Sequence, residues 1–153
     1  MIVQSRKILG VDPGVKGALA LLDAQGNVLE LRDMPIVKIS RRAEVDPVGI
    51  HDLLRMWRPT LAVIETQGPR KGVGGGASTF SLGRNYGCLT AALSIGKIAW
   101  VSVTPLVWKK KMRVTKEKAT SMAAVSRRFP HVHCSRHDHA EALLIAEYGR
   151  LYA

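Results

Sequence analysis

A chain of 153 residues has the length of one compact domain and can bury a core without disulfides or a structural metal. Its apolar share of 46% excludes wholesale disorder, and no stretch approaches the roughly 20 apolar residues that span a bilayer. No signal-like apolar run follows the N-terminal residues. The sequence therefore predicts a single cytosolic domain over residues 1–153, without membrane contact, in which Cys88 and Cys134 are reduced thiols.

The charge balance is strongly basic, with 23 Lys and Arg against 12 Asp and Glu, for a formal net charge of +11. The positive side chains cluster at residues 41–42, 70–71, 109–113 and 127–128. Such clusters favour a polyanionic partner, and nucleic acid is the commonest one because contacts with its phosphates release counterions. A solvated basic surface that only aids solubility is the alternative.

Apolar segments separated by short turns dominate the N-terminal part of the chain. Residues 6–11, 17–22 and 28–32 are predicted to be strands, with Gly and Asn in the turn at 24–27. This pattern predicts three antiparallel strands at one end of a sheet. The basic segment 34–45 is predicted to be an irregular loop.

The middle of the chain combines a helix, a buried strand and a glycine-rich segment. Asp46 can cap a helix that has Pro47 in its first turn. The short strand 61–64 is apolar and delivers Glu65 at its C-terminal end. The glycine-rich segment 66–78 is predicted to be a mobile loop.

Helical periodicity and one more apolar strand fill the rest of the chain. These elements are a helix at 80–94, a strand at 98–103 and helices at 105–111, 115–128 and 137–151. Strands that alternate with helices after a hairpin region predict an α/β fold. Its central sheet is mixed and five-stranded, with the three antiparallel strands first, and it is flanked by helices.

Four acidic side chains stand at the ends of predicted elements. Asp12 and Glu65 each follow an apolar strand, and two parallel central strands would place both carboxylates at the same edge of the sheet. Asp138 and Glu141 are three residues apart, so they share a helix face with the apolar residues that pack on the sheet. Because unpaired buried carboxylates are costly, this pattern favours a site for Mg²⁺, which prefers oxygen ligands.

Each acid also has a purely structural interpretation. Asp12 before Pro-Gly can be a turn residue, and Glu65 can cap a helix or pair with Arg70. Asp138 can cap the last helix, with Glu141 as its capping-box partner. The four acids together, each at the end of an element, favour a site.

The segments that carry these acids resemble the RuvC-type Holliday junction resolvases of the RNase H-like (retroviral integrase) superfamily, and most closely the compact forms found in phages and prophages. The matching stretches are ILGVDPG at 8–14, AVIE at 62–65 and DHAEALLIA at 138–146, with the helix at 83–92 and the basic stretch at 105–118. They cover almost the whole chain in the family's order. The resemblance implies an RNase H-like fold and a cytoplasmic location in a bacterial or phage-infected cell.

The resemblance also implies a homodimeric endonuclease that nicks two opposing strands of four-way or branched DNA, leaving 5′-phosphate and 3′-hydroxyl ends. By position, Asp12, Glu65, Asp138 and Glu141 match the family's catalytic metal-binding acids, although the family more usually has Asp where this chain has Glu141. The implied cofactor is a pair of Mg²⁺ ions in each active site, with Mn²⁺ able to substitute.

Basic side chains near the acids are predicted to bind DNA phosphates, because they adjoin either the glycine-rich loop or the basic stretch before the penultimate helix. A solvated helix face is the alternative for the lysines. The predicted DNA-binding residues are Arg70, Lys71, Lys109, Lys110, Lys116 and Lys118.

Two other motifs point away from nucleotide and zinc binding. No Walker-type lysine follows the glycines, so a phosphate-cradling P-loop is excluded. The histidines and Cys134 within residues 131–139 are zinc-type ligands, but their spacing matches no familiar finger. Local packing is favoured there, with tuning of the site by His137 or His139 as the alternative.

Two further functions stay open. One is another RNase H-like nuclease, acting on RNA–DNA hybrids or on other branches. The other is a junction-binding protein without catalysis. An actin-like ATPase is excluded because the chain is too short for two lobes.

Overall fold

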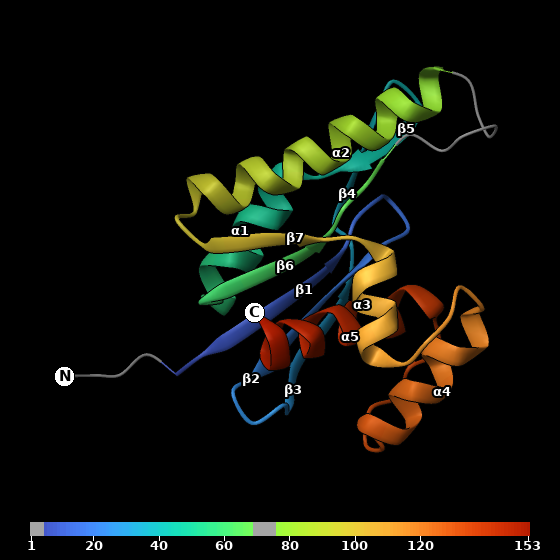
Figure 1. Cartoon of the computed structure of the whole chain (residues 1–153). Coiled ribbons are helices and arrows are strands. Elements are labelled where there is room, and N and C mark those ends of the chain that lie inside the picture. Colours follow the sequence, from blue (N-terminus) through green and yellow to red (C-terminus); the bar gives the residue numbers. More distant parts are fainter. Residues whose placement is uncertain (1–4, 69–75) are drawn as a thin grey trace.

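The computed structural model describes residues 5–68 and 76–153, and a mixed five-stranded sheet runs through its centre (Figure 1). The strands lie in the order β3-β2-β1-β6-β7. The first three are antiparallel and the last two are parallel to β1, as the sequence predicts. The strands are β1 (Lys7–Asp12), β2 (Ala18–Asp23), β3 (Val28–Asp33), β6 (Leu61–Glu65) and β7 (Ala99–Val103).

Helices cover both faces of this sheet (Figure 1). Helices α1 (Pro47–Trp57) and α2 (Gly76–Ile95) pack over one face around Leu9, Val11 and Ile64. The other face carries α3 (Pro105–Met112), α4 (Lys118–Arg128) and α5 (His137–Tyr152). Because β1 and β6 are buried on both faces, they are apolar almost throughout instead of alternating with polar residues.

Helix α5 lies unusually close to the central strands because glycines stand at the contacts. A Cβ added to Gly10 of β1 would collide with the backbone of Ala142 and Ala146 in α5. A Cβ added to Gly149 would lie 2.5 Å from Cγ2 of Val63 in β6. These contacts fix α5 antiparallel to β1, so the start of the helix lies beside the end of the strand.

The prediction of an irregular loop at 34–45 is wrong. This segment holds a two-stranded hairpin of β4 (Ile36–Ile39) and β5 (Arg42–Val45). Its two-residue turn has positive φ at both Ser40 (49°) and Arg41 (69°), the backbone of the hairpin turn that matches strand twist. The buried Asn85 side chain of α2 accepts a hydrogen bond from the Val45 N–H at 2.9 Å and so anchors the hairpin.

All the predicted helices are present, but α2 and α4 begin at other residues than predicted. Asp46 caps α1 as predicted, because its side chain accepts from the Val48 N–H at 3.0 Å. Helix α4 begins at Lys118 and not after Thr115, whose hydroxyl accepts from the Glu117 N–H in the preceding turn. Helix α2 begins earlier than predicted, at Gly76. Within the described part of the chain, no helix combines the length and apolar character needed to cross a bilayer.

Candidate active site

The ends of β1 and β6 bring two of the predicted acids to one edge of the sheet. Asp12 and Glu65 are the last residues of these strands, which are parallel neighbours with Val11 opposite Ile64. Both carboxylates are largely buried, since each residue is only 8% exposed. The two central strands therefore hold both carboxylates at this edge.

Helix α5 brings the other two acids to the same edge. Counted from the contact between Gly10 and Ala142, Asp12 is two strand residues away, or about 6–7 Å. Asp138 is four helix residues away in the same direction, or about 6 Å. The start of α5 thus lies level with the end of β1, with Glu141 buried and the Asp138 side chain one-third exposed.

Asp12 is the centre of this acidic group. Burial, followed by repulsion from Glu141, Glu65 and Asp138, raises the pKa of Asp12 from 3.8 to about 8. Lys109 lowers that pKa by a smaller amount. The Asp12 carboxyl is therefore largely protonated at neutral pH unless more positive charge enters the site.

Two neighbouring residues of α3 hold two of the acids, and sequence reasoning missed both contacts. The buried Trp108 indole N–H donates to Oε2 of Glu65 at 2.6 Å. The Lys109 ammonium lies 2.5 Å from Oε1 of Glu141, so this lysine, predicted to bind DNA, is paired with an acid of the site. The only signal in the sequence is a tryptophan inside a run of basic residues.

His137 also faces Glu141. Its Nε2 atom lies 3.1 Å from Oε1 of that carboxylate, but the pair is poorly aligned, and Nε2 is buried without a hydrogen-bond partner among the described residues. The carboxylate is thus flanked by an ammonium and an imidazole. Glu141 contacts these side chains in place of the helix N-terminus, which contradicts its interpretation as a capping-box partner.

Asp138 is not the N-cap of α5 either. The helix begins at His137 after Arg136, and no side chain caps it. Arg136 joins the Asp138 carboxylate at 3.2 Å to the backbone carbonyl of Lys16 at 2.8 Å, and it also pairs with Asp33. The network makes Asp33, at the end of β3, a fifth acid near this edge, and the sequence did not single it out.

The remaining predicted DNA-binding residues lie in different settings. Lys110 and Lys116 are exposed and line a groove of about 430 Å³ together with Pro105 and Leu106. Lys118 is exposed at the start of α4. The predicted contacts Arg70 and Lys71, and with them a pairing of Glu65 with Arg70, lie outside the described residues.

The donor set at this edge suits a hard cation. Its acids supply carboxylate oxygens, the ligands that divalent ions such as Mg²⁺ prefer. The pKa of Asp12 is raised by burial first and by three neighbouring carboxylates second, and a bound cation would oppose both effects. As they stand, no three His, Cys, Asp or Glu side chains in residues 5–68 and 76–153 are gathered closely enough to hold a metal ion. The same holds for the cluster of histidines and Cys134, so zinc gains no support there.

Comparison with solved structures identifies the architecture. RuvC of Thermus thermophilus, in complex with a Holliday junction substrate, superposes with a TM-score of 0.68 at 17% identity, over 96% of each chain. The chain has the RuvC fold. A second structure of Thermus thermophilus RuvC gives a TM-score of 0.61 at 17% identity, over 95% of this chain and 96% of that one.

The RuvC fold recurs in a third match. The yeast mitochondrial Holliday junction resolvase Ydc2 gives a TM-score of 0.57 at 14% identity, over 98% of this chain and 80% of that one. No protein-family model matches the sequence, and no curated protein sequence matches it significantly. The resemblance seen in the sequence is thus confirmed as a RuvC fold, and the chemistry of the site follows from this chain's own residues.

Proposed function

We propose that this protein is a metal-dependent, structure-selective endodeoxyribonuclease that resolves four-way or branched DNA by paired, symmetric nicks. One observation carries the proposal: the buried Asp12, at a strand end of a RuvC fold, lies near enough to Glu65, Asp138 and Glu141 for all three to raise its pKa. An acidic cluster alone would repel DNA, whereas the chain as a whole has a net charge of +11. A basic protein with an acidic centre suits phosphate chemistry once cations neutralise that centre.

Asp12, Glu65, Asp138 and Glu141 are the proposed ligands of two Mg²⁺ ions, with Mn²⁺ able to substitute. Such ions, when bound, supply an activated water and stabilise the leaving 3′ oxygen in phosphodiester hydrolysis, which gives 5′-phosphate and 3′-hydroxyl ends. The longer Glu141 side chain, in place of the family's more usual Asp, reaches the site from the same turn of α5.

The chain's own residues prepare this chemistry. Strands β1 and β6 fix the backbones of Asp12 and Glu65, and the indole of Trp108 orients one oxygen of Glu65. Lys109 pairs with the buried Glu141 carboxylate and neutralises its charge. These contacts reduce the rearrangement needed before reaction, which is how rigid sites lower reaction barriers.

DNA binding is assigned to the exposed basic surface beside the acids. Lys110, Lys116 and Lys118 lie on the α3–α4 side of the molecule and have positions suited to phosphate contacts. Paired nicks need two active sites, so a symmetric homodimer is part of the proposal. The exposed side of α2, which includes Phe80 at 66% exposure, is the candidate interface. A monomer by light scattering under assay conditions would contradict the dimer.

A cleavage assay on a synthetic four-way junction, labelled in turn on each strand, tests the proposal. We expect symmetric nicks in opposing strands with Mg²⁺ or Mn²⁺ and none with EDTA. Asp12→Asn should abolish cutting while junction binding stays within about twofold, because that carboxylate contributes to chemistry more than to affinity. An RNA–DNA hybrid and a nicked linear duplex serve as control substrates.

The same assay separates the alternatives. Cutting of the RNA–DNA hybrid without cutting of the junction would favour another RNase H-like nuclease. Junction binding without cutting, in both Mg²⁺ and Mn²⁺, would favour a binding protein. In either case the proposed resolvase activity would be refuted.

A further inference from the structure

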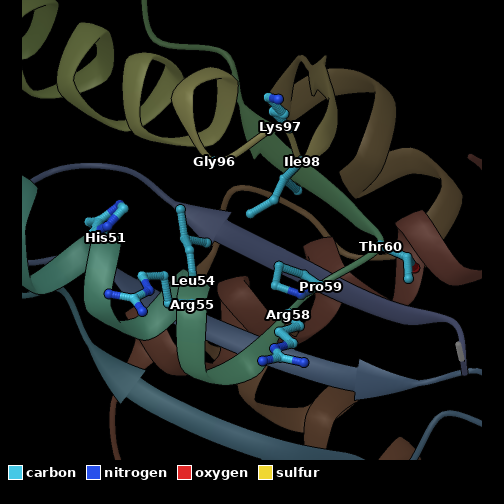
Figure 2. A pocket seen from close by; sticks show the side chains of 9 residues that line it. All are labelled: His51, Leu54, Arg55, Arg58, Pro59, Thr60, Gly96, Lys97 and Ile98. Carbon is cyan, nitrogen blue, oxygen red and sulfur yellow. The ribbon is translucent and has the colours of Figure 1, made fainter.

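A basic hollow lies at the edge of the sheet opposite the candidate active site. It has a volume of about 490 Å³ and lies between the C-terminal half of α1, the start of β6 and the turn after α2 (Figure 2). Strand β6 begins at this edge and ends at Glu65, so the hollow is separated from the acids by the length of that strand, about 16 Å.

Four basic side chains surround this hollow, and no acidic side chain is among its lining residues. His51, Arg55 and Arg58 come from one face of α1, and Lys97 stands on the other side, after α2 (Figure 2). We call this hollow the basic pocket. All four side chains are exposed, and none makes a hydrogen bond or ion pair with any residue in the described ranges.

Direct hydrogen bonds to the carbonyl groups at the helix ends do not explain this concentration of charge. Basic side chains often stand at helix C-termini because they complement the helix dipole. Here other groups already occupy the carbonyl oxygens at this edge. Leu54 O accepts from the Arg58 backbone N–H at 3.0 Å, Leu93 O accepts from the Ile98 N–H at 3.0 Å, and Trp57 O accepts from the Lys7 ammonium at 3.1 Å. The cationic side chains are thus free for another partner.

The backbone at two of these positions also favours a different residue. Arg58 and Lys97 both have positive φ, at 49° and 54°. This conformation follows helix ends, where glycine adopts it without strain and residues with a Cβ do not. The chain places a cation at both positions. Arg58 follows α1 on one side of the pocket, and Lys97 follows α2 on the other side. A role for the two side chains would account for the strained choice.

We propose that the basic pocket binds phosphate groups, either those of the DNA backbone or those of a free phosphorylated compound. Arg55 and Arg58 supply planar donor pairs that match phosphate oxygens, and Lys97 adds a point charge from the other side. Leu54 and Ile98 lie between the basic side chains and form an apolar floor (Figure 2). The inference does not depend on the acids cutting DNA.

Binding of tripolyphosphate, measured by titration calorimetry on the intact protein, is the first test. We expect Arg55→Gln combined with Lys97→Gln to weaken binding about tenfold, because charge-assisted contacts are lost. The matched control combines Lys38→Gln with Arg127→Gln. These side chains are exposed, lie outside the pocket and give the same change in net charge, so binding should change less than twofold.

Salt dependence of duplex DNA binding is the second test, and it identifies the source of the phosphate. If backbone phosphates occupy the pocket, the pocket variant should lower the slope of log K against log salt by up to about 2 relative to the control. Weaker tripolyphosphate binding with an unchanged DNA slope would instead identify a free phosphorylated ligand. No difference between the pocket variant and the control in either experiment would overturn the proposal. If the double variant fails to fold, Arg55→Gln alone carries both tests.

Discussion

Replacement of Asp12 by Asn tests the electrostatics of the candidate site without any substrate. Asn has nearly the same shape as Asp but no charge, so it removes the central carboxylate from a group of four acids. Burial and the other three carboxylates raise the pKa of Asp12 to about 8 in the folded protein, whereas an unfolded chain keeps the ordinary value of 3.8. The two states therefore bind protons differently between these pH values.

The sign of the effect follows from this difference. The folded protein holds a proton on Asp12 that the unfolded chain releases, so a rise in pH favours unfolding. The stability of the wild type should fall, because of this group, from about pH 4 to about pH 8 and then level off. The full pKa difference corresponds to about 6 kcal/mol. Local relaxation and protons shared among the carboxylates should reduce the observed change to roughly 2–3 kcal/mol.

The measurement is urea unfolding of both proteins in EDTA, followed by circular dichroism across this pH range. We expect Asp12→Asn to gain stability relative to the wild type as pH rises, and Mg²⁺ at the upper end to stabilise the wild type more than the variant. Titrating groups far from the site are common to both proteins and cancel in the difference, which therefore reports on Asp12 and the carboxylates coupled to it. A difference that does not change with pH would refute the raised pKa and the crowding of the four acids.

Three other substitutions address the contacts around the site. Trp108→Phe removes the indole donor and should lower the rate of junction cleavage about tenfold. Circular dichroism should show that the fold is retained. An unchanged rate would exclude a positioning role for Trp108. Lys109→Gln leaves a buried carboxylate without its ammonium and should lower the free energy of unfolding in EDTA by about 2 kcal/mol, whereas the exposed Lys110→Gln should change it by less than about 0.5 kcal/mol. Gly10→Ala forces α5 away from the sheet and should lower the free energy of unfolding in urea by about 3 kcal/mol. Gly83→Ala, on an open helix surface, should be neutral or slightly stabilising. Equal effects of the two substitutions would contradict the close packing of α5 on β1.

The sequence predicts the sheet because its central strands can be recognised from their local sequence alone. Residues 8–11 and 61–64 carry no polar side chain, as is typical of strands buried on both faces. The hairpin at 36–45 was missed for the opposite reason. Its turn at Ser40 and Arg41 adopts positive φ without glycine, asparagine or aspartate, so the usual hairpin signal is absent.

The candidate site shows the same division. Asp12 and Glu65 lie at the same edge of the sheet because each ends one of two parallel neighbouring strands. The order of elements in the sequence predicts this arrangement. The contacts of Trp108 and Lys109 with the acids depend on how α3 packs against β6 and α5. Such contacts join residues 32 and 43 positions apart in the chain, and no local pattern announces them. In sequence alone, a lysine that pairs with an acid of the site therefore cannot be told from the exposed lysines beside it.

The close contact between β1 and α5 fixes the position of Asp138 and Glu141 along the strand direction. Insertion of one residue between Glu141 and Ala142 would turn both acids by about 100° around the helix and carry them off the sheet edge. Any chain that keeps this packing must therefore keep the spacing from the acidic pair to the small residues at positions 142, 146 and 149. That spacing can be searched for even where the acids themselves differ.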